Sequence, residues 1–269
     1  MKIARYIQLS WLGAGLLVAA AGNAAEPAKT TLADAWQTLS IGFYSDAIDQ
    51  FTATGTSREA QLGLAIAQLN RPPVTPSSLA EAQRQFKQLS GDDMVGHAAR
   101  YFLGRFWQMH PMTPDPATAV REYEQLVATG ADDTWCRLAL AKLAILRLTV
   151  LPAPGAVATQ LAAVEPLLAR TADPATQHDL HLVIAEARLN HRIYDATTLG
   201  HLQAAFATTR EADTMRADLL IQVARVASLL GDRATARENY ERFLRDYPKE
   251  RRCYTVSEAL AHLDGAFPP

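Results

Sequence analysis

Four pairs of small and aromatic residues constrain the fold of this chain more than any other feature. In each pair an alanine is followed four residues later by a ring, at Ala47/Phe51, Ala82/Phe86, Ala119/Tyr123 and Ala236/Tyr240. The first three alanines are 35 and 37 residues apart, and the fourth follows after a further 117 residues, about three more periods. On a helix, the small residue lets a second helix approach and the ring fills the remaining gap. The spacing predicts an array of helical repeats instead of one globular core.

The rest of the chain agrees with a folded helical protein. Of its 269 residues, 49% are hydrophobic and 20% are charged, a composition that argues against disorder. Helical segments and short breaks alternate from residue 31 to residue 266, without a convincing two-residue alternation of β-branched side chains. We therefore expect an all-α fold, with one helical repeat domain over 31–266.

The first residues have the pattern of an export signal. Lys2 and Arg5 precede an apolar stretch from about Trp11 to Ala21, and the small residues of 22–25 then supply a cleavage site. We expect a signal peptide over 1–24, cleaved after Ala24 or Ala25, and a short linker over 25–30. The apolar stretch is shorter than the ~20 residues that span a bilayer, so removal is favoured over a retained membrane anchor, which stays the alternative.

Export would place the mature chain in the periplasm or outside the cell. Without residues 1–24 the chain keeps 24 basic and 28 acidic residues, a net charge of −4, so nucleic acid is not an expected partner. Membrane association is expected only through partners or an uncleaved N-terminus. Cys136 and Cys253 lie about three repeats apart, and because a disulfide needs Cα atoms within about 7 Å, two unpaired thiols are favoured over a bond.

Breaks between the helices carry recognisable capping signals. Gly91 and Gly130 are suited to ending a helix, and the aspartate pairs Asp92/Asp93 and Asp132/Asp133 that follow are suited to starting the next one. Further helix starts are predicted at a Ser78/Glu81 capping box and at the Asp-Pro steps 115–116 and 173–174. Proline-rich loops near 71–77, 110–116 and 151–155 are interpreted as spacers, with a docking edge as the alternative. Pro166 is expected to kink a helix.

The segment from Ala217 to Pro248 resembles a tetratricopeptide repeat (TPR) nearly position by position. Ala224 takes the small position of the first helix, Gly231-Asp232 the turn, and Ala236, Tyr240 and Pro248 the characteristic positions that follow. Weaker matches lie around residues 42–51 and 103–123, and the pattern degenerates between about Thr134 and Thr209. The resemblance implies an α-solenoid of about five or six antiparallel helical pairs. A final capping helix is expected over about 255–263, where Val256, Ala259, Leu260 and Leu263 share one face.

No catalytic motif occurs in the sequence, so we expect a protein that is not an enzyme and needs no cofactor. His178 and His181 share a helical face, with Glu186 further on, but ordinary histidines are favoured over a metal site. The alternative is an envelope enzyme for polysaccharide processing or metal-dependent hydrolysis, with its site in the degenerate segment.

The resemblance also implies a binding surface, because TPR arrays commonly hold a peptide or helix in the groove formed by their first helices. Registering these helices on Gly104, Ala141 and Ala224 predicts that five residues face the groove: Tyr101, Arg105, Gln108, Lys142 and Arg225. Three cations and a ring favour a protein or peptide partner with an acidic segment or a free carboxylate. A solvated groove with internal ion pairs stays open. The resulting hypothesis is an exported scaffold or adaptor of the cell envelope.

Overall fold

A computed structural model describes residues 30–110, 114–151, 157–210, 214–263 and 265. These residues form only helices and their connections, without a strand among them, which confirms the all-α prediction. The expected signal peptide over 1–24 lies outside the described residues. The chain divides into two compact units, Met1–Glu122 and Tyr123–Pro269.

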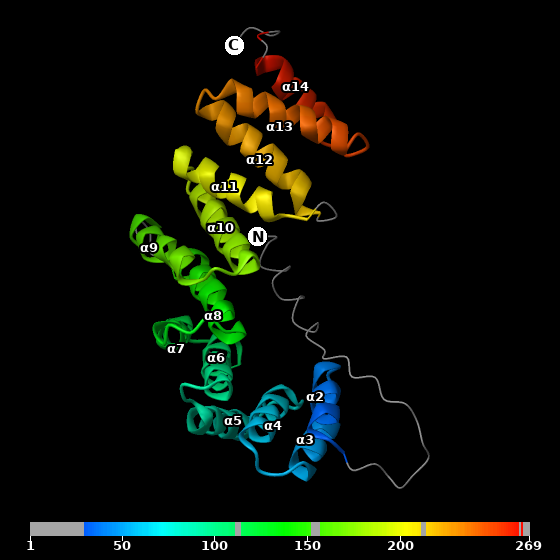
Figure 1. Ribbon diagram of the computed structural model, residues 1–269, viewed down its shortest axis with the longest axis vertical. Coiled ribbons are helices and arrows are strands. Elements are labelled where there is room, and N and C mark those ends of the chain that lie inside the picture. The colour runs from blue at the N-terminus through cyan, green and yellow to red at the C-terminus, as the bar shows by residue number, and fades with distance from the viewer. Residues whose placement is uncertain (1–29, 111–113, 152–156, 211–213, 264, 266–269) are drawn as a thin grey trace. The chain divides into compact units, whose positions relative to one another are not determined.

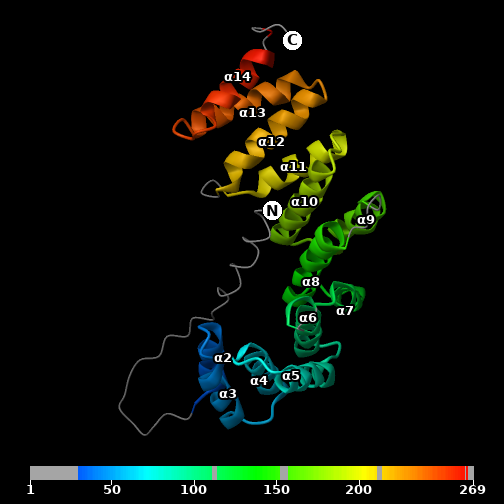
Figure 2. The ribbon, with the colours of Figure 1, turned by 180° about the vertical axis from the view of Figure 1, so that it is seen from behind.

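In the first unit, each helix packs against the next one along the chain (Figures 1 and 2). The helices are α2 (Leu32–Ser40), α3 (Tyr44–Ala53), α4 (Arg58–Asn70), α5 (Pro76–Leu89) and α6 (Met94–Met109). Contacts also join every second helix, α2 to α4 and α4 to α6. Helix α7 (Pro116–Ala128) contains the boundary between the two units.

The second unit repeats this sequential packing. Its elements are α8 (Thr134–Ile145), the π-helix η2 (Leu146–Val150), α9 (Val157–Val164), the 3₁₀-helix η3 (Glu165–Arg170), α10 (Pro174–Asn190), α11 (Ala196–Thr208), α12 (Met215–Leu229), α13 (Arg233–Asp246) and α14 (Cys253–Leu263). Helices α10 to α14 each contact the next, and α8 contacts α10. This order of contacts is that of an α-solenoid.

The residues of the four small and aromatic pairs are all buried. Ala47, Ala82, Ala119 and Ala236 have no exposed surface, and the paired rings are 0 to 6% exposed. The ring of Phe51 on α3 explains why small residues are needed on the next helix. A Cβ atom added to Gly63 on α4 would lie 2.2 Å from the ring, far inside van der Waals contact. The ring of Trp36 on α2 meets Phe51 edge-on, with centroids 5.2 Å apart.

Most of the predicted helix starts are confirmed. Asp93, Asp115, Asp133 and Asp173 each accept hydrogen bonds from backbone N–H groups of the following turn. The predicted Ser78/Glu81 capping box is wrong. Helix α5 begins three residues earlier, where the Thr75 hydroxyl accepts from the N–H of Ser78 and the Ser78 hydroxyl accepts from the N–H of Thr75. Pro76 then occupies the first turn, a position that needs no N–H.

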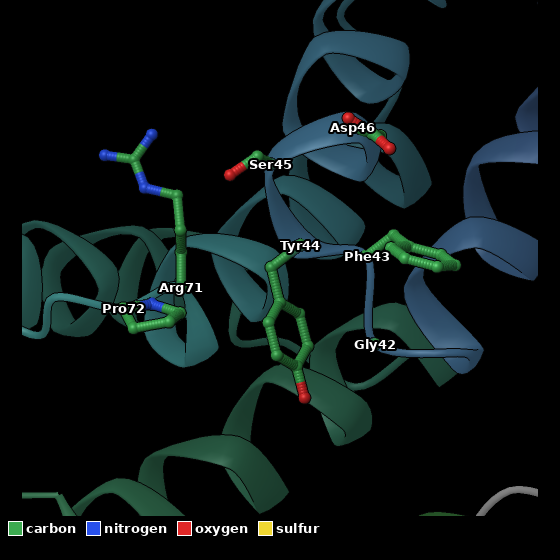
Figure 3. Close-up of a pocket in the computed structure, with 7 residues that line it drawn as sticks. All are labelled: Gly42, Phe43, Tyr44, Ser45, Asp46, Arg71 and Pro72. Carbon is green, nitrogen blue, oxygen red and sulfur yellow. The ribbon is translucent and has the colours of Figure 1, made fainter.

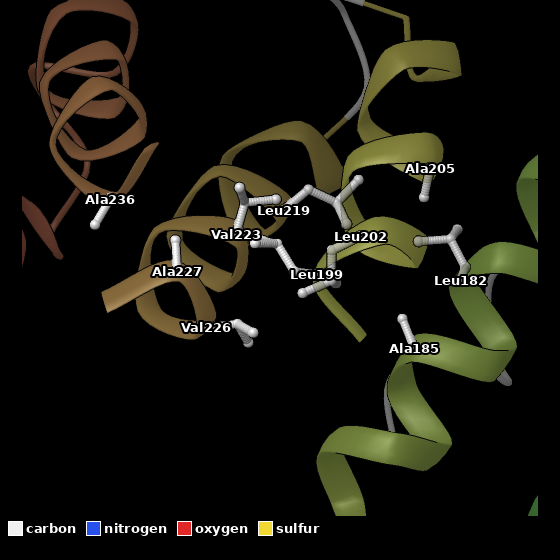
Figure 4. Close-up of a cluster of buried hydrophobic side chains, with 10 residues drawn as sticks. All are labelled: Leu182, Ala185, Leu199, Leu202, Ala205, Leu219, Val223, Val226, Ala227 and Ala236. Atoms are coloured by element: carbon white, nitrogen blue, oxygen red, sulfur yellow. The ribbon is translucent and has the colours of Figure 1, made fainter. Parts of the chain in front are cut away.

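Aliphatic side chains form a continuous core through α10, α11, α12 and α13 (Figure 4). Leu182 and Ala185 on α10 face Leu199, Leu202 and Ala205 on α11, and α12 contributes three further aliphatic residues before Ala227 reaches Ala236 on α13. A second cluster continues the core to α14. Val256 is buried there, with Ala259, Leu260 and Leu263 packed against the cluster, so the predicted face of the last helix is confirmed.

Two local predictions about the second unit also agree with the structure. Helix α9 ends at Val164, and a 3₁₀-helix that holds Pro166 in its first turn follows, as expected for a residue that cannot continue an α-helix. Cys136 and Cys253 are free thiols. The Cys136 thiol lies 3.8 Å from the Leu126 carbonyl, and the Cys253 thiol lies 3.1 Å from the Tyr247 carbonyl.

Candidate functional site

The structure places three of the predicted partner-binding residues on α6 of the first unit. Tyr101 has no exposed surface, and burial raises its pKa to about 12. A ring without exposed surface offers no contact to a partner, so the prediction that Tyr101 faces a groove is wrong. The reason is its spacing from Gly104: residues three apart share one helical face, and the buried Gly104 is on the face that packs against neighbouring helices.

Arg105 and Gln108 remain accessible on α6. Both side chains are partly exposed, and one guanidinium nitrogen of Arg105 lies 3.8 Å from the sulfur of Met109, one turn further on. A thioether is a weak acceptor, so this contact leaves the charge of Arg105 available to an anionic ligand. On the first unit, the accessible part of the predicted binding surface therefore consists of the Arg105 guanidinium and the Gln108 amide.

Lys142 and Arg225 belong to the second unit. Lys142 is half-buried on α8, and Arg225 is exposed on α12. Burial raises the pKa of Tyr240 on the neighbouring α13, and the positive charge of Arg225 opposes this rise. Arg225 therefore lies near the α12–α13 contact while its side chain stays in solvent.

A pocket in the first unit adjoins the turn between α2 and α3 (Figure 3). It is lined by Gly42, Phe43, Tyr44, Ser45, Asp46, Arg71 and Pro72. Phe43 precedes the first turn of α3 without a side-chain capping bond, and its ring is 59% exposed. The guanidinium of Arg71 extends away from the ring of Tyr44 in Figure 3. The pocket thus combines aromatic rings with groups of both charges, the Asp46 carboxylate and the Arg71 guanidinium.

Large exposed apolar residues gather at the same kind of position along the chain. Seven of the nine found among the described residues lie at the end of α6, η2 or α12 or in the segment that follows α2, α4 or α12: Ile41, Phe43, Val74, Met109, Val150, Leu229 and Leu230. Three of these positions adjoin the proline-rich loops that the sequence offered as spacers or as a docking edge. These are single residues spread along the chain, and single exposed apolar side chains are normal on a protein surface, so the spacer and docking-edge interpretations of the loops both stay predictions.

The histidines singled out in the sequence occupy α10 of the second unit. Nδ1 of His178 lies 3.0 Å from the Ala205 carbonyl oxygen and 2.9 Å from the Thr208 hydroxyl on α11. His181 meets a third histidine that the sequence reasoning missed: its Nδ1 lies 2.8 Å from Nδ1 of His201. Glu186 is half-buried further along α10, and burial raises its pKa.

His201 can be found from the sequence once α10 and α11 are read as a hairpin. Contacts between the two helices join Arg188 to Thr198, His181 to His201 and His178 to Ala205. As the residue number on α10 decreases, the number of its partner on α11 increases. The two residues of each pair therefore lie at nearly equal distances in sequence from the turn near residue 191. Reflecting residue 181 through that turn gives residue 201.

Beside the histidines, Arg188 is held by three side chains. Its guanidinium donates to Glu165 of η3 at 2.8 Å, to Asp195 at 2.7 Å and to the Thr198 hydroxyl at 3.0 Å. Arg188 is only 8% exposed, so this network joins η3, α10 and the start of α11 in the interior of the unit. Each of the three guanidinium nitrogens of Arg188 donates one of these bonds, so the network has a sufficient structural role.

No protein-family model matches the chain, and no curated protein matches it significantly. Among the described helices, none is both long and apolar enough to cross a lipid bilayer.

Proposed function

We propose that this chain is an exported TPR-like scaffold that holds a segment of another protein of the cell envelope. The proposal includes an α-solenoid of about five or six antiparallel helical pairs, closed by α14. It requires no cofactor and no catalytic group. Residues 1–24 would direct the chain to the periplasm or the cell exterior.

The observation that carries the proposal is the contact between a ring on one helix and a small residue on the next. Phe51 against Gly63 is the clearest case, since the ring fills the space that a Cβ atom would need. Repeated use of buried alanine and aromatic pairs supports a stack of similar units over a single core. Stacks of this kind expose long surfaces that suit extended partners.

Arrangement of the even-numbered helices supports a particular binding surface. Helices α2, α4 and α6 contact one another in sequence, and α8 contacts α10, as expected for the first helices of successive repeats. Arg105 and Gln108 on α6, Lys142 on α8 and Arg225 on α12 are candidates to contact the partner on the two units. Their charges favour an acidic segment or a carboxylate.

Charge reversal tests this surface. An Arg105→Glu/Arg225→Glu variant should recover less of the native partner than the parent chain from a periplasmic and membrane extract. The deficit should be larger at low salt, because exposed charges are screened over about 8–10 Å at physiological ionic strength. Arg233→Glu/Arg251→Glu is the matched control, since it makes the same change in net charge at two other exposed positions.

The melting curves of both variants should stay close to that of the parent, because Arg225, Arg233 and Arg251 are exposed and Arg105 is partly exposed, and surface substitutions usually change stability by less than about 0.5 kcal/mol. Equal recovery by the parent and the Arg105/Arg225 variant would reject the proposed surface. A Phe43→Ser variant that alone loses the partner would instead assign binding to the surface around Phe43 on the first unit. A mass that includes residues 1–24 in the exported protein would contradict cleavage of the leader.

A further inference from the structure

The contact between His181 and His201 is unusual in that it joins two imidazole nitrogens of the same type. The two Nδ1 atoms are 2.8 Å apart, and the ring centroids are 5.1 Å apart at an angle of 49°. At this distance one Nδ1 carries a hydrogen and the other presents its lone pair, because two N–H groups would repel. Two nitrogen atoms that could bind a metal therefore face each other across 2.8 Å.

Surroundings of the pair keep both imidazoles in the neutral form that binds metals. His201 is only 8% exposed, and burial together with the charges of His181 and Arg188 lowers its pKa to about 4 against a smaller opposing effect of Asp195. Burial, then His178, lowers the pKa of His181. Neutral imidazoles do not have to lose a bound proton from the ring before coordinating a metal at neutral pH.

His178 adds a third imidazole one turn before His181. Its Nδ1 donates to the Ala205 carbonyl, because a carbonyl oxygen only accepts hydrogen bonds. The other nitrogen, Nε2, then carries the lone pair. Among the described residues, however, His178 does not bring a ring nitrogen close to both Nδ1 atoms of the pair, so the candidate site has two protein ligands.

The distance between the two Nδ1 atoms is close to that required by a shared metal ion. Zinc binds imidazole nitrogens at about 2.0–2.1 Å, so two ligands in tetrahedral geometry are about 3.3 Å apart. The pair would have to open by only about 0.5 Å, a change that small side-chain rotations supply. Copper and nickel also favour imidazole ligands.

We propose that His181 and His201 bind a divalent transition metal ion through their Nδ1 atoms, with Zn²⁺ as the probe. The imidazole that carries the shared hydrogen moves it to its own Nε2, so coordination releases no net proton from the neutral pair. Water completes the coordination. The ion would join α10 to α11 across the contact that both helices already make.

Isothermal titration of the untagged, purified chain with Zn²⁺ tests the site. We expect one equivalent to bind the parent, and His181→Gln and His201→Gln each to weaken the affinity at least about tenfold, the lower range for disturbing a metal site. His191→Gln is the matched control, because His191 is exposed at the end of α10 and should leave the affinity unchanged.

Thermal unfolding provides a second readout that does not depend on the heat of binding. At one Zn²⁺ concentration, the unfolding temperature of the parent and of the His191 variant should rise by more than that of the other two variants, because the stabilisation by a ligand that binds the native state grows with its affinity. Circular dichroism first establishes that each variant is folded. Absence of binding to the parent, or equal affinity in all four folded chains, would overturn the proposal.

Discussion

Arg188 offers the sharpest test of how the second unit is held together. Replacing it with methionine retains an unbranched apolar side chain but removes every donor of the guanidinium. The bonds to Glu165, Asp195 and Thr198 disappear together, and α10 loses its polar links to η3 and to the start of α11.

The expected loss of stability in Arg188→Met depends on how exposed the partners of Arg188 are. Breaking a fully buried ion pair costs about 3–5 kcal/mol, because a charge is left without a partner. Here the side chains of Glu165 and Asp195 are 35% and 46% exposed, so water can solvate both carboxylates in the variant. We therefore count about 0.5–1 kcal/mol for each ion pair and about 1 kcal/mol for the buried bond to Thr198. Arg188→Met should destabilise the second unit by about 2–3 kcal/mol.

Thermal unfolding followed by circular dichroism measures this loss. At about 2–4 °C per kcal/mol for a unit of this size, the unfolding midpoint should fall by roughly 5–10 °C. Hydrogen exchange should locate the added opening in α10 and α11. Arg237→Met is the control, since Arg237 lies 3.9 Å from Glu241 and is 45% exposed, and removing such a pair usually costs less than about 0.5 kcal/mol. If both variants melt within about 2 °C of each other, the network does not stabilise the unit.

Two further predictions concern a glycine position and acid stability. Gly63→Ala should destabilise the first unit by about 1–3 kcal/mol in a urea titration, because its methyl group would overlap the ring of Phe51. Gly200→Ala, with open space around its Cβ, should instead stabilise α11 by up to about 1 kcal/mol. A stabilising Gly63→Ala together with a destabilising Gly200→Ala would refute this description of the packing. Burial by itself would raise the pKa of Asp195, but hydrogen bonds from Thr198 and Arg188 lower it overall, below the ordinary 3.8. The stabilisation by Asp195 is thus present above its unfolded pKa and is lost as the pH falls through the folded value. The melting difference between the parent and Asp195→Asn should therefore shrink as the solution is acidified through that range; a difference that does not change with pH would contradict this assignment.

The sequence was sufficient to predict the elements that depend on local chemistry. The pairing of Ala47 with Phe51, and its later copies, correctly identified buried positions, because a spacing of four residues fixes a helical face. Asp173 was correctly expected to start a helix, since its carboxylate and the proline after it need only the next turn. Predictions of this kind require no knowledge of distant residues.

The errors arose where a second helix decides the outcome. Tyr101 was assigned to a groove from its distance to Gly104, although that spacing puts both residues on the face covered by neighbouring helices. His201 was missed because its partner His181 is twenty residues away and is reached only through the turn between two helices. Ser78 was taken as a helix start because a glutamate follows it, while the hydroxyl of Thr75 competes successfully for the same role.

Sequential packing of the helices has a consequence for the way the chain acquires its structure. Within each unit, a helix packs mainly against its neighbours along the chain, and contacts two places apart join α2 to α4, α4 to α6 and α8 to α10. A chain of this kind does not have to wait for its last residues before its first contacts form, and local contacts close quickly because they require only short loops. During synthesis, each new helix can therefore dock on a surface that is already complete, and the apolar face that remains uncovered at any moment is that of the newest helix alone.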